Sequence, residues 1–330
     1  MASKRKETDV VGSSNDKKKK GTPNEIGIIL SNKSEKTRYN KLLNRQIQLN
    51  RYPNSHVLDA LGIEDNVMTL IGNIGWNDFV GQTHYTYETS TREFLSTICF
   101  DMDRENVTDP KHTVSFSLCN IEYCMSLPEF CDKMGFASTG LIHVSHSGDT
   151  RPQNYDQNEF WLKISGRDHF VSKSAKASMI HNPVFRYVHR VMSCTIFGRP
   201  ETGTVRSDEL FILWAMINKC PVNTGYCLLN HLAYVAAQPK GKMVAGGLIT
   251  FIAWKMGSVF PIEESYIEGN YAIDLDFCKN MHMVRDLDGK SKNFQLLISK
   301  EASILLPNPS RTDITNVENW LYYNIAPQVP

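Results

Sequence analysis

The clearest hydrophobic pattern in the chain lies between residues 181 and 257, where apolar side chains recur every three or four positions. This period is typical of helices that bury one face. Asn182 is a good N-cap, and Pro183 suits the first helical turn because proline has no N–H group to leave unpaired there. Gly198 follows the last periodic residue. The pattern therefore predicts a first helix from 182 to about 198.

Three further helices are predicted in the same segment. Ser207 caps a run of apolar residues that carries two acidic side chains in its first turn, where the helix dipole favours negative charge. A third helix is expected over about 223–238 and a fourth over about 244–256, closed by Gly257 in a position where a left-handed cap is common. Four helices so close in sequence predict a compact bundle, the helical core at about 181–257.

The region before this core is predicted to contain short helices. Broken apolar patterns suggest two small helices around Leu58 and Leu70. Ser90 and Glu93 match a capping box, in which each side chain bonds to the backbone N–H of the other residue. This match predicts a helix from about 91 to 100.

A β-hairpin and a helix are expected next. Apolar and polar residues alternate over 114–118 and again over 121–125, which predicts two strands with one buried face. Cys119 and Asn120 would form the turn between them. Asn120 tolerates a positive φ but Cys119 does not favour one, so the turn type stays open. A second capping box predicts a short helix over 126–135.

Shorter elements are predicted on either side of the helical core. Residues 160–164 match a short strand, and alternation at 271–277 and at 294–298 predicts two more. Trp320 and its neighbours predict a short terminal helix that packs on the body.

Composition divides the chain into three parts. Residues 1–40 are polar and lysine-rich and cannot bury enough apolar surface to offset the entropy of ordering, so a disordered basic tail is expected. Residues 41–150 are predicted to form a mixed α/β-hairpin subdomain, and residues 151–330 a helical core domain with short C-terminal strands. Glycine, proline and amide side chains at 147–158 mark the break. The predicted fold class is mainly α with small β-hairpins (α+β).

The charges are distributed unevenly along the chain. The sequence holds 36 lysine and arginine residues against 35 acidic residues, but its first twenty residues contain seven basic and three acidic side chains. The remainder is slightly acidic, which makes the folded surface a poor general binder of phosphate. A nucleic-acid role would therefore depend on the tail or on a local patch. Residues 163–176 form the most basic folded segment, which fits either contact with phosphates or an acidic partner, or a solvated approach to the core.

Two basic clusters separated by ten residues give the tail the spacing of a bipartite nuclear import signal. Such clusters fit the acidic grooves of an import receptor or the phosphates of RNA. The alternative is a solvated tail that only aids solubility. The clusters consist of Lys4, Arg5, Lys6, Lys17, Lys18, Lys19 and Lys20.

The positions of the cysteines and histidines favour a role in the hydrophobic core over a role in metal binding or catalysis. Cys227 and His231 lie four residues apart on the third predicted helix, a spacing that would suit zinc or a thiolate–histidine pair. On an apolar helix such residues are more often part of the core. Cys119, Cys124 and Cys131 have no histidine placed among them and do not match a zinc knuckle. We therefore expect no catalytic residue, cofactor or metal.

The expected compartment is the cytoplasm or the nucleus. Eight cysteines without a signal sequence are typical of reduced thiols. The longest strongly apolar window, 243–254, is about a dozen residues, whereas a transmembrane helix takes about twenty. We expect no membrane segment.

A family resemblance is carried by the string CTIFGRPETGTVRSDELFILWAMINKCPVNTGYCLLNHL at 194–232. It resembles the central block of the ORF-1 protein of Athila-type plant retrotransposons, LTR elements of the gypsy class. Further similar strings extend the resemblance over about residues 60–325. They are FSLCNIEYCMSLPEFCDKMGF, SKSAKASMIHNP, LLPNP and NWLYYN.

The resemblance implies a noncatalytic, gag-like structural role, either self-association or RNA binding. The expected partners are further copies of the chain, element RNA bound through the basic tail, and an import receptor, with no membrane. A protein-interaction module and a decayed remnant are the alternatives. A cysteine-dependent or zinc enzyme fits less well.

Overall fold

The structure, a computed structural model, describes residues 27–101, 112–138, 151–287, 289, 292–298 and 303–322. Within these residues helices dominate, and the strands form two small three-stranded antiparallel sheets. The predicted fold class, mainly α with small β-hairpins, is confirmed.

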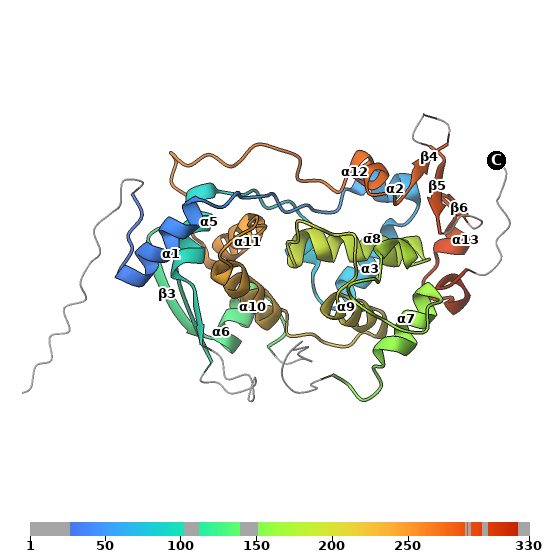
Figure 1. Ribbon diagram of the computed structural model, residues 1–330, viewed down its shortest axis with the longest axis horizontal. Helices are drawn as coiled ribbons and strands as arrows, with labels where there is room; N and C mark the ends of the chain where they lie inside the picture. The colour runs from blue at the N-terminus through green and yellow to red at the C-terminus, as the bar shows by residue number, and fades with distance from the viewer. Residues whose placement is uncertain are drawn as a thin grey trace, which may run out of the picture.

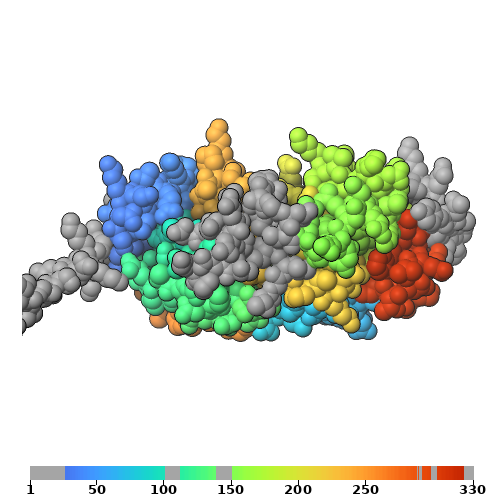
Figure 2. Space-filling model, turned by 90° about the horizontal axis from the view of Figure 1, so that it is seen from below, coloured from blue at the N-terminus to red at the C-terminus, as the bar shows by residue number. Residues whose placement is uncertain are grey.

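The elements gather in two lobes along the long axis of the molecule (Figure 1). The first lobe contains α1 (Lys33–Leu43), α5 (Glu88–Thr97), β1 (Cys99–Asp101), β2 (Thr113–Leu118), β3 (Ile121–Ser126), α6 (Leu127–Met134), α10 (Thr224–Ala237) and α11 (Gly246–Met256). The second lobe contains α2 (Ser55–Leu61), α3 (Glu64–Asn73), α7 (Gln157–Ser165), η1 (Ala177–Met179), α8 (Pro183–Val191), η2 (Met192–Ile196), α9 (Ser207–Asn218), α12 (Leu275–Asn280), β4 (Arg285–Asp286), β5 (Phe294–Leu297), β6 (Ser303–Leu306), α13 (Pro309–Thr312) and η3 (Val317–Asn319). The short helix α4 (Asn77–Val80) lies between the lobes, since it contacts α3 and its Phe79 ring meets Phe136 and Phe251. Seen from below, the dark blue residues at the start of the described chain lie at one end and the red residues near its end lie at the other (Figure 2).

Three of the four predicted core helices begin or end at the residues that were expected to cap them. Asn182 accepts hydrogen bonds from two backbone N–H groups at the start of α8, and Asn223 accepts one, from Tyr226, at the start of α10. Helix α8 continues into the π-helical turn η2 and ends before Gly198. Gly257 adopts a left-handed φ of 70° and closes α11. The bounds of these helices are confirmed within a residue or two, but the predicted cap of α9 is wrong: its N-cap is Arg206, and Ser207 is the first helical residue.

The prediction of one compact four-helix bundle is wrong in arrangement. Helices α8 and α9 pack on each other and on α3 in the second lobe, whereas α10 and α11 pack on α5 and α6 in the first. Small residues allow this close approach. A Cβ atom on Gly225 of α10 would lie 2.4 Å from the Cys131 sulfur of α6, and one on Gly246 of α11 would lie 2.2 Å from Thr86. The four helices therefore do not share one bundle core: α8 and α9 pack together on α3, whereas α10 and α11 pack on α5 and α6.

The hairpin is confirmed, and its turn type is now defined. Strands β2 and β3 pair from Thr113 opposite Ser126 to Leu118 opposite Ile121. Cys119 and Asn120 both have positive φ angles, 54° and 61°, which is the type I′ geometry that matches strand twist.

The predicted capping box at Ser90 and Glu93 is wrong. Helix α5 begins at Glu88, and Ser90 donates to Glu264 from both its N–H and its hydroxyl. Glu93 is buried instead and accepts the N–H groups of both hairpin-turn residues at 2.8 Å each. The second capping box, at the start of α6, is present as predicted.

Two of the shorter predicted strands are replaced by helices. Residues 160–164 lie in α7, which begins after the N-cap Asp156 and buries Phe160, Trp161 and Ile164 on one face. Alternation at 271–277 ends at Asp274, which caps α12. The strand predicted at 294–298 is confirmed as β5, which pairs with β6 and β4. The predicted terminal helix is a single 3₁₀ turn, η3, just before Trp320.

One hydrophobic cluster runs through both lobes and includes residues from α3, α5, α8 and α11. Segments on both sides of residue 150 contribute to each lobe. The division into residues 41–150 and 151–330 stays a prediction about folding units. The break itself, at 147–158, lies partly outside the described residues, and so does the tail at 1–40. Residues 33–40, predicted as part of the disordered tail, belong to helix α1 instead.

Candidate functional site: a buried ion network beside an interlobe pocket

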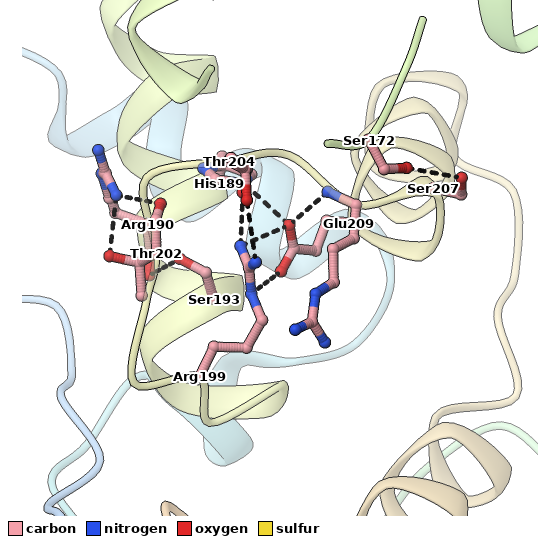
Figure 3. Close-up of polar contacts among 10 residues, drawn as sticks. Ser172, His189, Arg190, Ser193, Arg199, Thr202, Thr204, Ser207 and Glu209 are labelled. Atoms are coloured by element: carbon pink, nitrogen blue, oxygen red, sulfur yellow. Dashed lines mark hydrogen bonds and ion pairs between the residues drawn. The ribbon is translucent and has the colours of Figure 1, made fainter. Parts of the chain in front are cut away.

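The second lobe buries an ionic network between α8 and α9 (Figure 3). Glu209 lies in the first turn of α9, His189 lies in α8, and Arg199 lies in the loop that connects the two helices. All three side chains are almost completely excluded from solvent. Buried ionisable groups are rare unless they are paired, so their partners define what the site can do.

Glu209 is the centre of the network. Its Oε2 atom accepts hydrogen bonds from His189 Nε2 at 3.0 Å and from the Arg206 backbone N–H at 2.9 Å. Arg199 approaches the same carboxylate with two nitrogens: Nε lies 2.8 Å from Oε1, and Nη2 lies 3.0 Å from Oε2. Only the Nη2 contact has the geometry of a hydrogen bond, so the pair is a close ion pair with one charge-assisted hydrogen bond.

The loop that carries Arg199 is fixed at both ends. Gly198 has a φ of 38°, and a Cβ atom there would lie 1.9 Å from the Val244 carbonyl oxygen, so only glycine fits. Residues 175–177 pair with 203–205 through backbone hydrogen bonds of 2.8 and 2.9 Å. Arg199 also donates to the Thr204 carbonyl at 2.6 Å. The position of the guanidinium is therefore fixed by the loop as well as by the carboxylate.

The protonation states follow from burial. Burial lowers the pKa of His189, although the Glu209 carboxylate opposes this shift. A neutral His189 donates its Nε2 proton to Glu209 and leaves the buried Nδ1 atom without a partner. Burial also lowers the pKa of Arg199, while Glu209 raises it. The network thus contains one carboxylate and one guanidinium with a neutral imidazole beside them.

Two further arginines of α8 are buried without a carboxylate contact. Arg186 donates to the backbone carbonyls of Ile180 at 2.8 Å and Leu297 at 3.0 Å, and burial lowers its pKa to about 9. Arg190 donates to the carbonyl and the hydroxyl of Thr202. These cations join α8 to β5 and to the loop before α9, which is a structural use of charge.

A pocket of about 310 Å³ lies beside the network, where the chain crosses between the lobes. Its lining includes Arg199 and Thr202 from the network loop, Cys194 from η2 and Phe277 from α12. Arg51 also lines it, with its guanidinium 4.8 Å from the centre of the Phe277 ring. Burial raises the pKa of the Cys194 thiol to about 11, so at neutral pH this group is not the thiolate that nucleophilic chemistry needs.

The cysteine and histidine singled out on α10 do not form an activated pair. Burial raises the pKa of Cys227 to about 12 and lowers that of His231 to about 4. Both shifts favour the neutral forms, whereas a thiolate–imidazolium pair needs the charged ones. The His231 ring meets Phe197 edge to face. Among the residues that the structure describes, no cluster of three or more histidine, cysteine or acidic side chains is placed to hold a metal ion.

The basic residues predicted from the sequence fall into two groups. Lys4, Arg5, Lys6, Lys17, Lys18, Lys19 and Lys20 lie outside the described residues. In the basic segment 163–176, Lys163 pairs with Glu159 at 2.6 Å, while Arg167, Lys173 and Lys176 are exposed. Their role in binding stays a prediction. No helix within the described ranges has the length and apolar character needed to cross a bilayer.

Sequence reasoning missed the ion network. Glu209 was placed correctly in the first turn of a helix, where its charge was attributed to the helix dipole. The available signal was an acid inside an otherwise apolar run, next to a histidine and arginines on the preceding predicted helix. That signal does not reveal which of these groups meet.

The comparison with known families finds the same family that the sequence of residues 194–232 resembles. A family model described as the ATHILA ORF-1 family matches residues 13–219, which is more than half of the chain and includes the complete ion network. The strings quoted beyond residue 219 lie outside this match. No curated protein and no solved structure matches the chain. The chain therefore belongs to the ATHILA ORF-1 family of Athila-type retrotransposon proteins.

Proposed function

We propose that this protein is a noncatalytic, gag-like component of a plant LTR element of the gypsy class, which self-associates and recruits element RNA. The family membership supplies the retrotransposon context. The observation that carries the proposal is the separation of charge: the cations of the second-lobe core serve the scaffold, while seven of the chain's basic residues are concentrated in its first twenty positions. Phosphate contacts would therefore come from the tail.

Self-association is supported by the surface of the first lobe. Val259 and Ile262 are 83% and 98% exposed, and Trp254 is 51% exposed. Exposed apolar side chains that gather in one region are typical of interaction surfaces. The same proposal places the protein in the nucleus or the cytoplasm. An import receptor would bind the basic tail.

The test is size-exclusion chromatography with light scattering on the full chain, with and without a single-stranded RNA oligonucleotide. Seven phosphate contacts predict a loss of RNA affinity of about a thousand-fold between about 50 and 200 mM salt. Deletion of residues 1–20 should remove most of the binding, because it removes those contacts. A matched control replaces Lys173 and Lys176 with glutamine, which should leave most of the binding intact.

Different outcomes separate the alternatives. Assemblies that form without RNA and persist at high salt would favour a protein-interaction module. A chain that stays monomeric and does not bind RNA would contradict the gag-like role and leave a decayed remnant. RNA binding that survives the deletion but is lost in the Lys173 and Lys176 variant would move the site to the folded basic segment.

A further inference from the structure

The first lobe presents exposed aromatic and apolar side chains on two neighbouring segments, residues 84–88 and 254–268. Thirteen large apolar side chains are exposed among the described residues, and five of them lie here. They are Tyr85, Trp254, Val259, Ile262 and Tyr266. We call this region the aromatic-acidic surface.

This surface is held by direct contacts. Tyr85 stacks on Tyr266 with ring centroids 4.5 Å apart, and Tyr87 stacks on Phe260 at 3.9 Å. Tyr87 and Tyr266 also form a backbone bridge. Glu264 accepts two hydrogen bonds from Ser90 of α5, at 3.0 and 2.6 Å. Because these contacts order the loop after α11, the surface is formed before any partner binds.

The charge of the surface is negative. Its segments and the residues that touch them carry five carboxylates, on Asp78, Glu88, Glu263, Glu264 and Glu268. Two cations beside them are already paired: Arg92 with Glu88, and Lys255 with Asp78 at 3.0 Å. Glu263 and Glu268 are exposed. Such a surface repels phosphates and favours a cationic partner.

The surface already binds one ammonium group of its own. The Lys255 nitrogen lies 4.6 Å from the centre of the Trp254 ring while it pairs with Asp78. An aromatic face beside a carboxylate is a good environment for lysine or arginine, because the ring quadrupole and the negative charge both attract the cation. The stacked pair of Tyr85 and Tyr266 offers further aromatic faces next to the acidic loop.

The chain itself contains a segment of the matching chemistry. Residues 1–20 carry seven basic and three acidic side chains. The described part begins at Gly27, whose carbonyl accepts a hydrogen bond from Asn120 at 3.0 Å. Asn120 belongs to the hairpin turn that Glu93 of α5 holds. The tail therefore leaves the body on the first lobe, and the seven residues from Lys20 to Gly27 reach about 23 Å when extended.

We propose that the lysine-rich residues 1–20 dock on the aromatic-acidic surface of their own chain. Attachment at a short distance gives the tail a high effective concentration, on the order of millimolar, so its own copy is favoured over a second one. Together with the proposed function, this contact makes RNA and the surface compete for the same lysines. RNA binding would then uncover the apolar side chains and permit self-association.

The first test is carbodiimide cross-linking of the full chain, which joins lysine amines to nearby carboxylates. Equal amounts of ¹⁵N-labelled and unlabelled chain are mixed before the reaction, and the cross-linked peptides are identified by mass spectrometry. We expect Lys17–Lys20 to be linked to Glu263 or Glu268, with both peptides carrying the same isotope. Pairs of mixed isotope would show a second copy as the occupant and would overturn docking within one chain. Equal yields at the exposed acids Asp65 and Glu201 of the second lobe would overturn the surface.

The second test uses RNA affinity. Replacing Glu263 and Glu268 with glutamine should release the tail, so if the tail is docked about 90% of the time the affinity for a single-stranded RNA oligonucleotide rises about tenfold. The matched control replaces Asp65 and Glu201 and should leave the affinity unchanged. An unchanged affinity in the first variant, in a chain that binds RNA, would refute docking. If the chain binds no RNA but the cross-links form, docking stands and only the proposed RNA role fails.

Discussion

Replacing Glu209 with glutamine tests whether the ion network holds the second lobe together. The substitution keeps the size of the side chain but removes the charge that compensates Arg199, which is only 4% exposed. It also turns one acceptor of Glu209 into a donor that faces other donors. Removing one partner of a buried pair typically costs about 3–5 kcal/mol, because the remaining charge stays buried without compensation. Since glutamine retains one acceptor, we expect the lower end, about 3 kcal/mol.

The assay is equilibrium unfolding in guanidinium chloride, followed by tryptophan fluorescence and far-ultraviolet circular dichroism. Glu201 provides the control, because it lies in the same loop and is exposed. Replacing it with glutamine should change the free energy of unfolding by less than about 0.5 kcal/mol. The same charge is lost in both variants, so the difference between them reports burial and pairing.

A double-mutant cycle with Arg199→Met sharpens the result. When both charges are absent, neither is left uncompensated, so the double variant should be more stable than the sum of the single losses by about 2 kcal/mol. A loss below about 1 kcal/mol for Glu209→Gln, or strict additivity in the cycle, would show that the pair contributes little. The buried network would then be a consequence of the fold rather than one of its supports.

Three further variants test other parts of the structure by the same unfolding assay. Trp214 is 7% exposed, so Trp214→Ala should cost about 3–5 kcal/mol, and a loss below about 1 would contradict its burial. Gly198→Ala should cost more than about 1 kcal/mol because of the contact with Val244, whereas Gly203→Ala, which meets no atom within 4 Å, should stay near wild type. Burial raises the pKa of Glu93 from 4.5 to about 7, so the folded state binds the extra proton and loses stability as pH rises between these values. Glu93→Gln should abolish this slope, and a slope unchanged from wild type would contradict the assignment.

The helix ends could be predicted because their causes are local. Asn182, Asn223 and Gly257 each act on backbone groups within a few residues, so the sequence around them contains the whole interaction. The hairpin is local for the same reason. Its turn could not be assigned from Cys119 alone, because its positive φ is stabilised by Glu93, which lies 26 residues away in the sequence.

Polar side chains with distant partners were not predictable. Glu93 matched a capping box with Ser90, yet both residues bond to segments far along the chain. Glu209 matched a dipole-favoured acid, yet it also binds the buried side chains of His189 and Arg199. Glu93 gives up a local interaction worth about 1 kcal/mol for buried ones, whereas Glu209 keeps its local bond to the Arg206 N–H and adds buried partners. Leaving a carboxylate or an N–H group unpaired in the core would cost more.

The packing partners of the helices also required the structure. Helices α9, α10 and α11 are apolar on most of their faces, so their periodicity does not select one neighbour. Selection comes from close contacts such as that between Gly225 and the Cys131 sulfur, which a one-dimensional pattern does not contain. The single bundle was therefore a reasonable prediction with the wrong partners.

The ion network and the aromatic-acidic surface differ in whether the family model covers them. His189, Arg199 and Glu209 all lie within the residues that the family model matches, whereas residues 254–268 of the aromatic-acidic surface lie beyond them. A loss of stability in Glu209→Gln would thus concern the scaffold that this chain shares with its family. Because part of the surface lies outside the match, docking of the tail has to be measured on this chain itself. If cross-linking supports docking while the ion network proves dispensable, the role of the protein depends on its surface charges and not on its buried ones.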